Sequence, residues 1–224
     1  MPKPIADQAA SAPAAAAPAA AAPITFSLTA TNGSSLAGDA YFSVFPPPLK
    51  SPPVSSQVLT ALVSAATSEA NETTTLTWNG GSGALALLAM AEDGAPATAG
   101  KTPVALGDKV MVTWADGAYT IVPSTGGPAS AVEVDIDPSV PPNSLIGLVV
   151  GPAPILVGIP AGLGPLTLEP DLSPTATVVF GTACVYPPAP ISDVDQGLTV
   201  TFSGTPTAAA QVAVGLDNLI QQTG

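Results

Sequence analysis

The chain has 224 residues, enough for one large all-β domain or two small ones, with a sizeable buried core. It has four lysines, no Arg, no His and 16 acidic residues, for a formal net charge of -12. Such a surface cannot assemble the basic patch that nucleic-acid phosphates or anionic lipids require. No apolar run free of Pro and Gly is long enough for a transmembrane helix. We therefore expect no nucleic-acid partner and no membrane insertion.

The missing residue types also argue against an enzyme. His is the usual general base near neutral pH, and Arg is the usual bidentate clamp for anions. Cys184 is the only cysteine, so an intrachain disulfide is excluded. As a nucleophile Cys184 would lack a His partner, and the alternative is a small buried hydrophobe beside Val185 and Tyr186. No Gly-rich loop opens a helix, so we expect a non-enzymatic protein without a cofactor.

Residues 1–23 form an Ala/Pro-rich arm in which Pro13, Pro18 and Pro23 recur every five residues and interrupt helix formation. The composition predicts either a disordered tail or a semi-rigid, partly extended tether that docks on a neighbouring subunit. Lys3 is followed by Asp7 and by prolines, which is unlike a signal peptide. The compartment stays open, either cytoplasmic or released to the cell surface without a recognisable signal.

The first strand-like runs follow the arm. Ile24–Ala30 alternates apolar and polar residues, which is typical of a half-buried strand. Tyr41–Phe45 is a second short strand, ended by three prolines. Val58–Ala66 shows helical spacing but is also acceptable as a buried strand, and we interpret it as a strand because its neighbours are strands.

Two dipeptides predict tight hairpins, because Asn-Gly and Asp-Gly favour two-residue turns. The first joins Thr73–Trp78 to Ala84–Met90 through Asn79-Gly80, and the second joins Lys109–Trp114 to Ala118–Val122 through Asp116-Gly117. Further strand-like runs are Val104–Leu106, Ala131–Asp137, Ser144–Val150, Ile155–Ile159, Leu166–Glu169, Thr175–Phe180, Leu198–Ser203 and Ala208–Val214.

Short strands with turn signals every roughly 8–12 residues are typical of all-β folds. Ser144–Val150 and Ile155–Ile159 are nearly all apolar and should be buried on both faces. The prediction is an antiparallel β-sandwich or jelly-roll-like fold, with residues 24–224 as a single domain behind the arm.

Three carboxylates are the best candidate for a chemical site. Glu133, Asp135 and Asp137 are spaced i, i+2, i+4 and share one face of a strand, and Ca²⁺ prefers such oxygen ligands. Asp193 and Asp195 form a similar pair. The alternative is a solvated strand face, since nothing resembles a spaced calcium loop. Any metal site is therefore expected at Glu133, Asp135 and Asp137, with Ca²⁺ as the ion.

Sugar binding usually needs aromatic platforms beside carboxylates, and the tryptophans available are Trp78 and Trp114. Each could serve such a platform or could pack at a sheet rim. Sugar or Ca²⁺ binding is thus the alternative to a structural role.

The second half of the chain resembles a family of bacterial proteins. It contains DGAYTI (Asp116–Ile121), VEVDID (Val132–Asp137), VGIPAGLGPLTLEPDLSPTATVVFG (Val157–Gly181) and VDQGLTVTFSG (Val194–Gly204), in that order. This order of strands and turns is similar to RhiA-like proteins, over about residues 24–214. The resemblance implies a β protein made under cell-density control. It carries no catalytic residues over to this chain, and the Ala/Pro-rich arm departs from the pattern.

Low charge suggests self-assembly into a homo-oligomer or filament. Charged residues make up 9% of the chain, against about a quarter in typical domains. Sheet edges are commonly protected by lysine, which is scarce here. Ile24–Ala30, carried on the arm, could add to the sheet edge of another copy. The alternative is a soluble monomer in which this strand pairs within its own chain.

Overall fold

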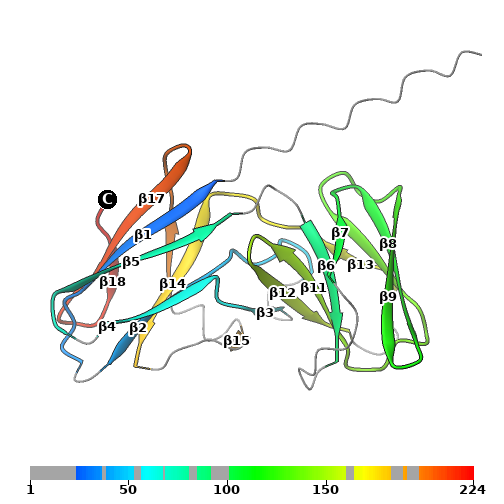
Figure 1. The fold of residues 1–224 in the computed structure, drawn as a ribbon, viewed down its shortest axis with the longest axis horizontal. Helices are drawn as coiled ribbons and strands as arrows, with labels where there is room; N and C mark the ends of the chain where they lie inside the picture. Colours follow the sequence, from blue (N-terminus) through cyan, green and yellow to red (C-terminus); the bar gives the residue numbers. More distant parts are fainter. Residues whose placement is uncertain are drawn as a thin grey trace, which may run out of the picture.

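The computed structural model describes residues 24–36, 39–52, 57–67, 69–80, 85–91, 101–159, 164–182, 189–190 and 197–224. The regular structure in these ranges is β-strand, arranged in four sheets (Figure 1). Within the same ranges no helix is long and apolar enough to cross a membrane. The predicted all-β, sandwich-like class is confirmed.

Two four-stranded sheets lie in the left half of Figure 1 and are built from both ends of the described chain. The β1 sheet has the order β18-β17-β1-β5, and the β14 sheet has the order β16-β14-β2-β4. Their inward side chains, such as Leu28, Leu76 and Val178, form what we name the terminal core. The strands are β1 (Thr25–Asn32), β2 (Ala40–Phe45), β4 (Val63–Thr67), β5 (Glu72–Asn79), β14 (Thr175–Gly181), β16 (Leu198–Thr201), β17 (Thr207–Val214) and β18 (Ile220–Gln222).

The other two sheets come mainly from the middle of the chain. The β11 sheet has the order β15-β3-β12-β11-β6-β7, and the β8 sheet has the order β13-β10-β8-β9. Side chains such as Val112, Val134 and Leu148 fill the central core between them. The strands are β3 (Gln57–Leu59), β6 (Leu85–Met90), β7 (Thr102–Val104), β8 (Asp108–Ala115), β9 (Ala118–Thr125), β10 (Val132–Ile136), β11 (Leu145–Val150), β12 (Ala153–Gly158), β13 (Leu166–Leu168) and β15 (Ala189–Pro190).

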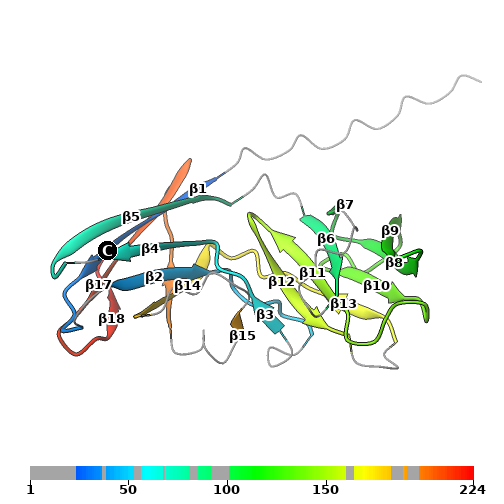
Figure 2. The same ribbon diagram turned by 60° about the horizontal axis from the view of Figure 1, so that its bottom comes forward.

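The interior is thus divided into two cores, where the sequence predicts one sandwich. The chain passes back and forth between them, because β3 and β15 join the β11 sheet while their neighbours in sequence belong to the terminal pair. Strand β2 connects the cores directly: Phe42 and Val44 are buried in the terminal core, and Phe45 is buried in the central core. Figure 2 shows the two sheet pairs side by side along the molecule.

Strand β1 lies inside its sheet. It pairs in parallel with β17, with Thr25 opposite Thr207, and antiparallel with β5, with Thr25 opposite Asn79. Both backbone edges of this strand are therefore occupied within one chain. The alternative, in which this strand pairs within its own chain, is the arrangement found, and β1 has no free edge for pairing with another copy.

Two strand pairs are parallel, β1 with β17 and β8 with β10, so these two sheets are mixed rather than purely antiparallel.

Of the two predicted hairpins, one is confirmed. β8 and β9 pair antiparallel around Asp116 and Gly117, whose φ values of 53° and 79° are those of a type I′ turn. The other is wrong, because β5 and β6 lie in different sheets. Gly80 continues the pairing with β1 by donating its N–H to the Ile24 carbonyl at 2.8 Å. A Cβ there would collide with the ring of Phe26, so close packing rather than a turn requires this glycine.

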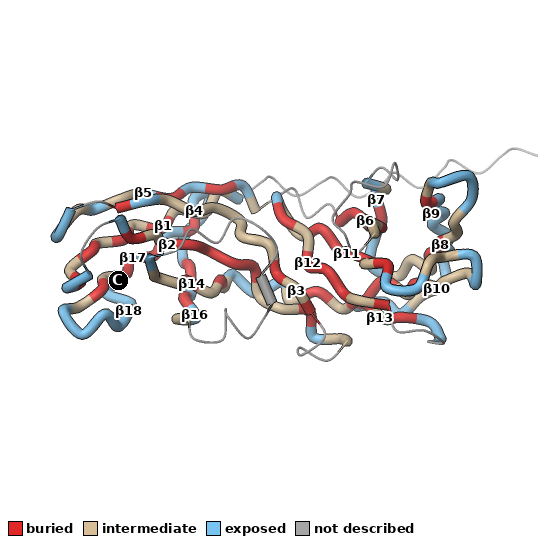
Figure 3. Tube along the Cα trace, turned by 90° about the horizontal axis from the view of Figure 1, so that it is seen from below, coloured by how far each residue is buried: buried red, intermediate tan, exposed pale blue. Residues whose placement is uncertain are grey.

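The run Val58–Ala66 splits into β3 and β4, which belong to different sheets. The apolar strands are as predicted: β11 and β12 are buried along most of their length (Figure 3). Strand β11 is central in its sheet, between β12 and β6, and its four consecutive residues from Ile146 to Val149 are buried, so both of its faces are covered.

Because neither core comes from a continuous segment, we expect the protein to unfold in one cooperative transition. Leu28→Ala in the terminal core and Leu148→Ala in the central core should each lower the free energy of unfolding by about 2–5 kcal/mol, because both side chains are fully buried. Differential scanning calorimetry should show a single shifted peak for each variant. Leu219→Ala, at a 61% exposed position, is the control. Two separate peaks, each moved by one substitution only, would contradict this view.

Candidate functional site

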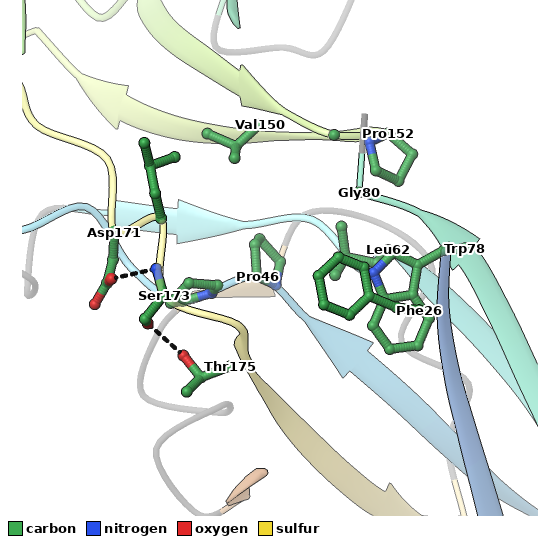
Figure 4. Close-up of a pocket in the computed structure, with 13 residues that line it drawn as sticks. Phe26, Pro46, Leu62, Trp78, Gly80, Val150, Pro152, Asp171, Ser173 and Thr175 are labelled. Carbon is green, nitrogen blue, oxygen red and sulfur yellow. Dashed lines mark hydrogen bonds between the residues drawn. The ribbon is translucent and has the colours of Figure 1, made fainter. Parts of the chain in front are cut away.

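A pocket of about 120 Å³ opens where the two sheet pairs meet. Its walls come from five places: the aromatic ends of β1 and β5, the proline loop after β2, Leu62 just before β4, the β11–β12 turn at Gly151, and the loop before β14. Figure 4 shows these side chains converging on one space. Ligand pockets usually measure roughly 300–1,000 Å³, so this one has room for a single small ring or side chain.

The aromatic wall is built from neighbouring strands. Phe26 on β1 lies directly opposite Trp78 on β5. Their rings stack with centroids 5.5 Å apart and an angle of 10° between planes. Phe202 packs edge-on against both rings, at 5.5 Å and 5.3 Å. Trp78 is buried while Phe26 is half-buried, so the stack closes the end of the terminal core and presents an apolar surface to the pocket.

The proline wall is held by one buried amide. Pro46 and Pro47 follow β2, and the loop continues through Leu49, which is fully buried. The Gln57 side chain accepts from the Leu49 N–H at 2.8 Å and donates to the carbonyls of Leu49 and Pro52 at 2.9 Å and 2.8 Å. Because Gln57 is itself buried, these bonds are shielded from water and fix the loop.

The opposite wall carries the polar groups of the pocket. The Asp171 carboxylate accepts from the backbone N–H of Ser173 at 2.9 Å, and the hydroxyls of Ser173 and Thr175 bond each other at 2.8 Å. The Ser173 N–H holds the pKa of the Asp171 carboxyl below its usual value, with a smaller contribution from Lys50, whose Nζ lies 3.9 Å away. Among the described residues that line the pocket, Asp171 is the one titratable side chain, so these residues supply ligand contacts but no acid–base pair.

The predicted metal ligands lie elsewhere, at the β8 sheet. Lys109 on β8 donates to Glu133 at 2.7 Å, and its Nζ lies 3.1 Å from Asp135. The bond to Glu133 and then the bond to Asp135 raise the pKa of Lys109. Asp137 lies past the end of β10, and hydrogen bonds from Ser139 lower its pKa.

A lysine ammonium thus occupies the position that a cation would take between Glu133 and Asp135, and Asp137 is engaged separately. In the described ranges no group of three or more acidic, His or Cys side chains is placed to hold a metal ion. The Ca²⁺ hypothesis therefore has no gathered ligand set to support it.

The two tryptophans have different surroundings. Trp78 belongs to the pocket, whereas Trp114 packs against Tyr119 with centroids 4.4 Å apart, beside the β8–β9 turn. Cys184, Asp193, Asp195 and the arm of residues 1–23 lie outside the described residues.

Sequence reasoning missed most of the pocket. The spacing of Asp171 and Ser173 is a signal for a local turn in which the carboxylate accepts from a backbone N–H two residues on. Gln57 carried no signal, because its partners are backbone groups of a loop. The meeting of Phe26 with Trp78 follows only from the pairing of β1 with β5.

Comparison of the chain with protein-family models, with curated proteins and with solved structures finds no match. Function is therefore inferred from the geometry of the site.

Replacing Gln57 tests the anchoring of the proline wall. Gln57→Leu leaves the buried N–H and carbonyl of Leu49 without these partners, and we expect a loss of about 3 kcal/mol in the free energy of unfolding. Urea denaturation measures it. Gln211→Leu, at an exposed position on β17, is the matched control and should change stability little. Equal stability of the two variants would show that Gln57 is not the anchor.

The Asp171 turn predicts a pH dependence. A lowered folded-state pKa means that the contribution to stability is complete above the ordinary pKa of 3.8 and is lost as pH falls through the lowered value. Asp171→Ala should cost about 1 kcal/mol near neutral pH, because the carboxylate is partly exposed. Thermal unfolding from about pH 6 to about pH 2 should show the gap between parent and variant closing at the acid end. A gap of constant size would contradict the assignment.

Proposed function

We propose that this is a non-enzymatic, self-assembling structural β protein, in which the Ala/Pro-rich arm of one copy docks into the aromatic pocket of another. The observation that carries the proposal is the stacked Phe26–Trp78 wall facing a space of about 120 Å³. Aromatic-lined grooves bind proline-rich segments because a polyproline II helix is already ordered and loses little entropy on binding. RhiA-like character, which the sequence resemblance implies, is compatible with this role.

The composition of the arm matches the pocket. From Gln8 to Pro23 the arm has no charged residue, and the pocket walls are apolar apart from the Asp171, Ser173 and Thr175 side. A single proline ring is the largest group that most of the arm offers, which fits the small volume.

The position at which the arm leaves the fold favours binding between copies. The Ile24 carbonyl accepts from the N–H of Gly80, which itself lines the pocket, so Ile24, the residue that follows the arm in sequence, lies beside the pocket of its own copy. A polyproline II segment rises about 3.1 Å per residue, so a bound arm places Pro13 roughly 30 Å from Ile24. Prolines at that distance reach the pocket of a neighbour rather than their own. Repeated head-to-tail contacts of this kind give filaments unless the rotation closes a ring.

A second candidate is binding of a sugar ring. The Phe26–Trp78 wall stands across from a carboxylate and two hydroxyls, Asp171, Ser173 and Thr175, and a few polar groups in an apolar pocket can orient a ligand. An oligosaccharide that changes Trp78 fluorescence, where the arm peptide does not, would favour this candidate over assembly.

The test uses a synthetic peptide of residues 9–23 and the full chain. In a Trp114→Phe background, fluorescence reports Trp78 alone, and we expect saturable quenching or a blue shift on titration. The free peptide should also disperse assemblies seen by light scattering, because it competes with the tethered arm. A peptide with Ala at the three prolines should do neither.

Matched variants locate the contact. Leu172→Ser removes an exposed leucine of the pocket wall and should weaken peptide binding about tenfold, which is about 1.4 kcal/mol. Leu216→Ser, at an exposed leucine outside the pocket, should leave binding unchanged.

A variant that lacks the arm should lose residues 1–23 only, because β1 begins at Thr25 and is an inner strand of its sheet. A protein that is monomeric at high concentration with its arm intact would overturn the proposal.

A further inference from the structure

One sheet edge differs from the others in the described part of the chain. Edge strands expose unpaired backbone groups and are usually protected by short length, proline or charge. Three edge strands, β7, β9 and β15, contain a proline. Strands β4, β13, β16 and β18 have five residues or fewer. Strand β5 has eight residues and contains neither Pro nor Lys.

Strand β5 ends the order β18-β17-β1-β5, and no described strand pairs with its outer side. In Figures 2 and 3 it runs along the upper margin of the left half of the molecule. Its side chains alternate: Thr73, Thr75 and Thr77 are exposed, whereas Leu76 and Trp78 are buried. Its one charged residue, Glu72, stands at its first position.

We infer that residues 73–78 of β5 form a dimerisation edge, at which two copies pair antiparallel about a two-fold axis. The two β1 sheets then become one continuous sheet, with four strands from each copy. A two-fold interface must be complementary to itself. A row of threonines along an exposed strand face meets this requirement, because the same side chains face each other when the two strands run in opposite directions.

The register supports a copy of the same chain as the partner. Residues directly opposite each other in an antiparallel pair share a face, so the axis must pass through a residue such as Thr75 or Leu76. With the axis at Thr75, Thr73 lies opposite Thr77. With the axis at Leu76, Thr75 lies opposite Thr77. Either choice places threonine beside threonine, a favourable cross-strand pair, and never places Glu72 beside itself.

The Ala/Pro-rich arm is a poor occupant of this edge. Pro13, Pro18 and Pro23 have no N–H, so the arm cannot supply a continuous hydrogen-bonded ladder. The inference therefore adds a second, arm-independent contact to the proposed assembly, and either contact can fail without the other.

The experiment compares full-length chains by sedimentation velocity, with excess arm peptide present so that the pocket contact is saturated. Thr75→Lys/Thr77→Lys places lysine opposite lysine in both registers, and we expect the dimer dissociation constant to rise about tenfold or more. Ala209→Lys/Gln211→Lys adds the same charge on exposed positions of β17, which is separated from β5 by β1. This control should remain dimeric. Thermal unfolding confirms that both variants are folded.

Hydrogen exchange gives an independent readout. In the dimer, amides of residues 73–78 that face outward should exchange more slowly as protein concentration rises, and the lysine pair on β5 should abolish that dependence.

A parent chain that stays monomeric with peptide present, and whose β5 amides exchange at a concentration-independent rate, would overturn the β5 edge while leaving the arm contact standing. Loss of the dimer in the β17 control as well would also overturn it, since net charge would then be the cause. A dimer that forms although the peptide never binds would refute the arm and support the edge.

Discussion

The burial of both faces of β2 is the constraint that holds the two cores together. Phe42 and Val44 point into the terminal core, and Phe45 points to the central core together with Leu49 just beyond the strand. A strand buried on both faces cannot slip by one residue without moving apolar side chains between two packed interiors. The register of β2 against β14 and β4 therefore fixes how the two sheet pairs meet.

The pocket is a consequence of that meeting. Each sheet pair ends at the junction with side chains that cannot all be covered by the other. The terminal pair ends in Phe26 and Trp78, and the central pair ends in the turn around Gly151. Two of the loops at the junction are held by side-chain hydrogen bonds, one to Gln57 and the other to Asp171. Rigid walls of this kind favour a ligand that is itself ordered before it binds.

The alternation of apolar and polar residues predicted most strands, because that pattern depends on local burial alone. The Asp116-Gly117 hairpin was predicted for the same reason, since both residues adopt the positive φ that the turn requires. The Asn79-Gly80 hairpin failed because β6 pairs with β11 and β7 in another sheet, while Gly80 continues the pairing of β5 with β1. The parallel pairing of β1 with β17 joins the two ends of the described chain, and no local pattern encodes it.

The candidate site was less predictable than the fold for the same physical reason. The acidic triad was visible in the sequence because its spacing is local, yet Lys109 comes from the neighbouring strand and neutralises part of its charge. Trp78 was visible as a residue type but not as a pocket wall. Its role depends on Phe26, which only the pairing of β1 with β5 brings beside it.

Scarcity of charge need not leave sheet edges unprotected. Lysine commonly protects sheet edges, but this chain has 27 prolines and only four lysines. Proline removes a backbone donor and so interrupts any incoming ladder without adding charge. Pro103 on β7 and Pro123 on β9 lie on edge strands of the central pair, where each removes a backbone N–H donor from the edge strand. An eight-residue edge without proline is then the exception in a chain so rich in it, and an exception of that kind is where a contact between copies would be expected.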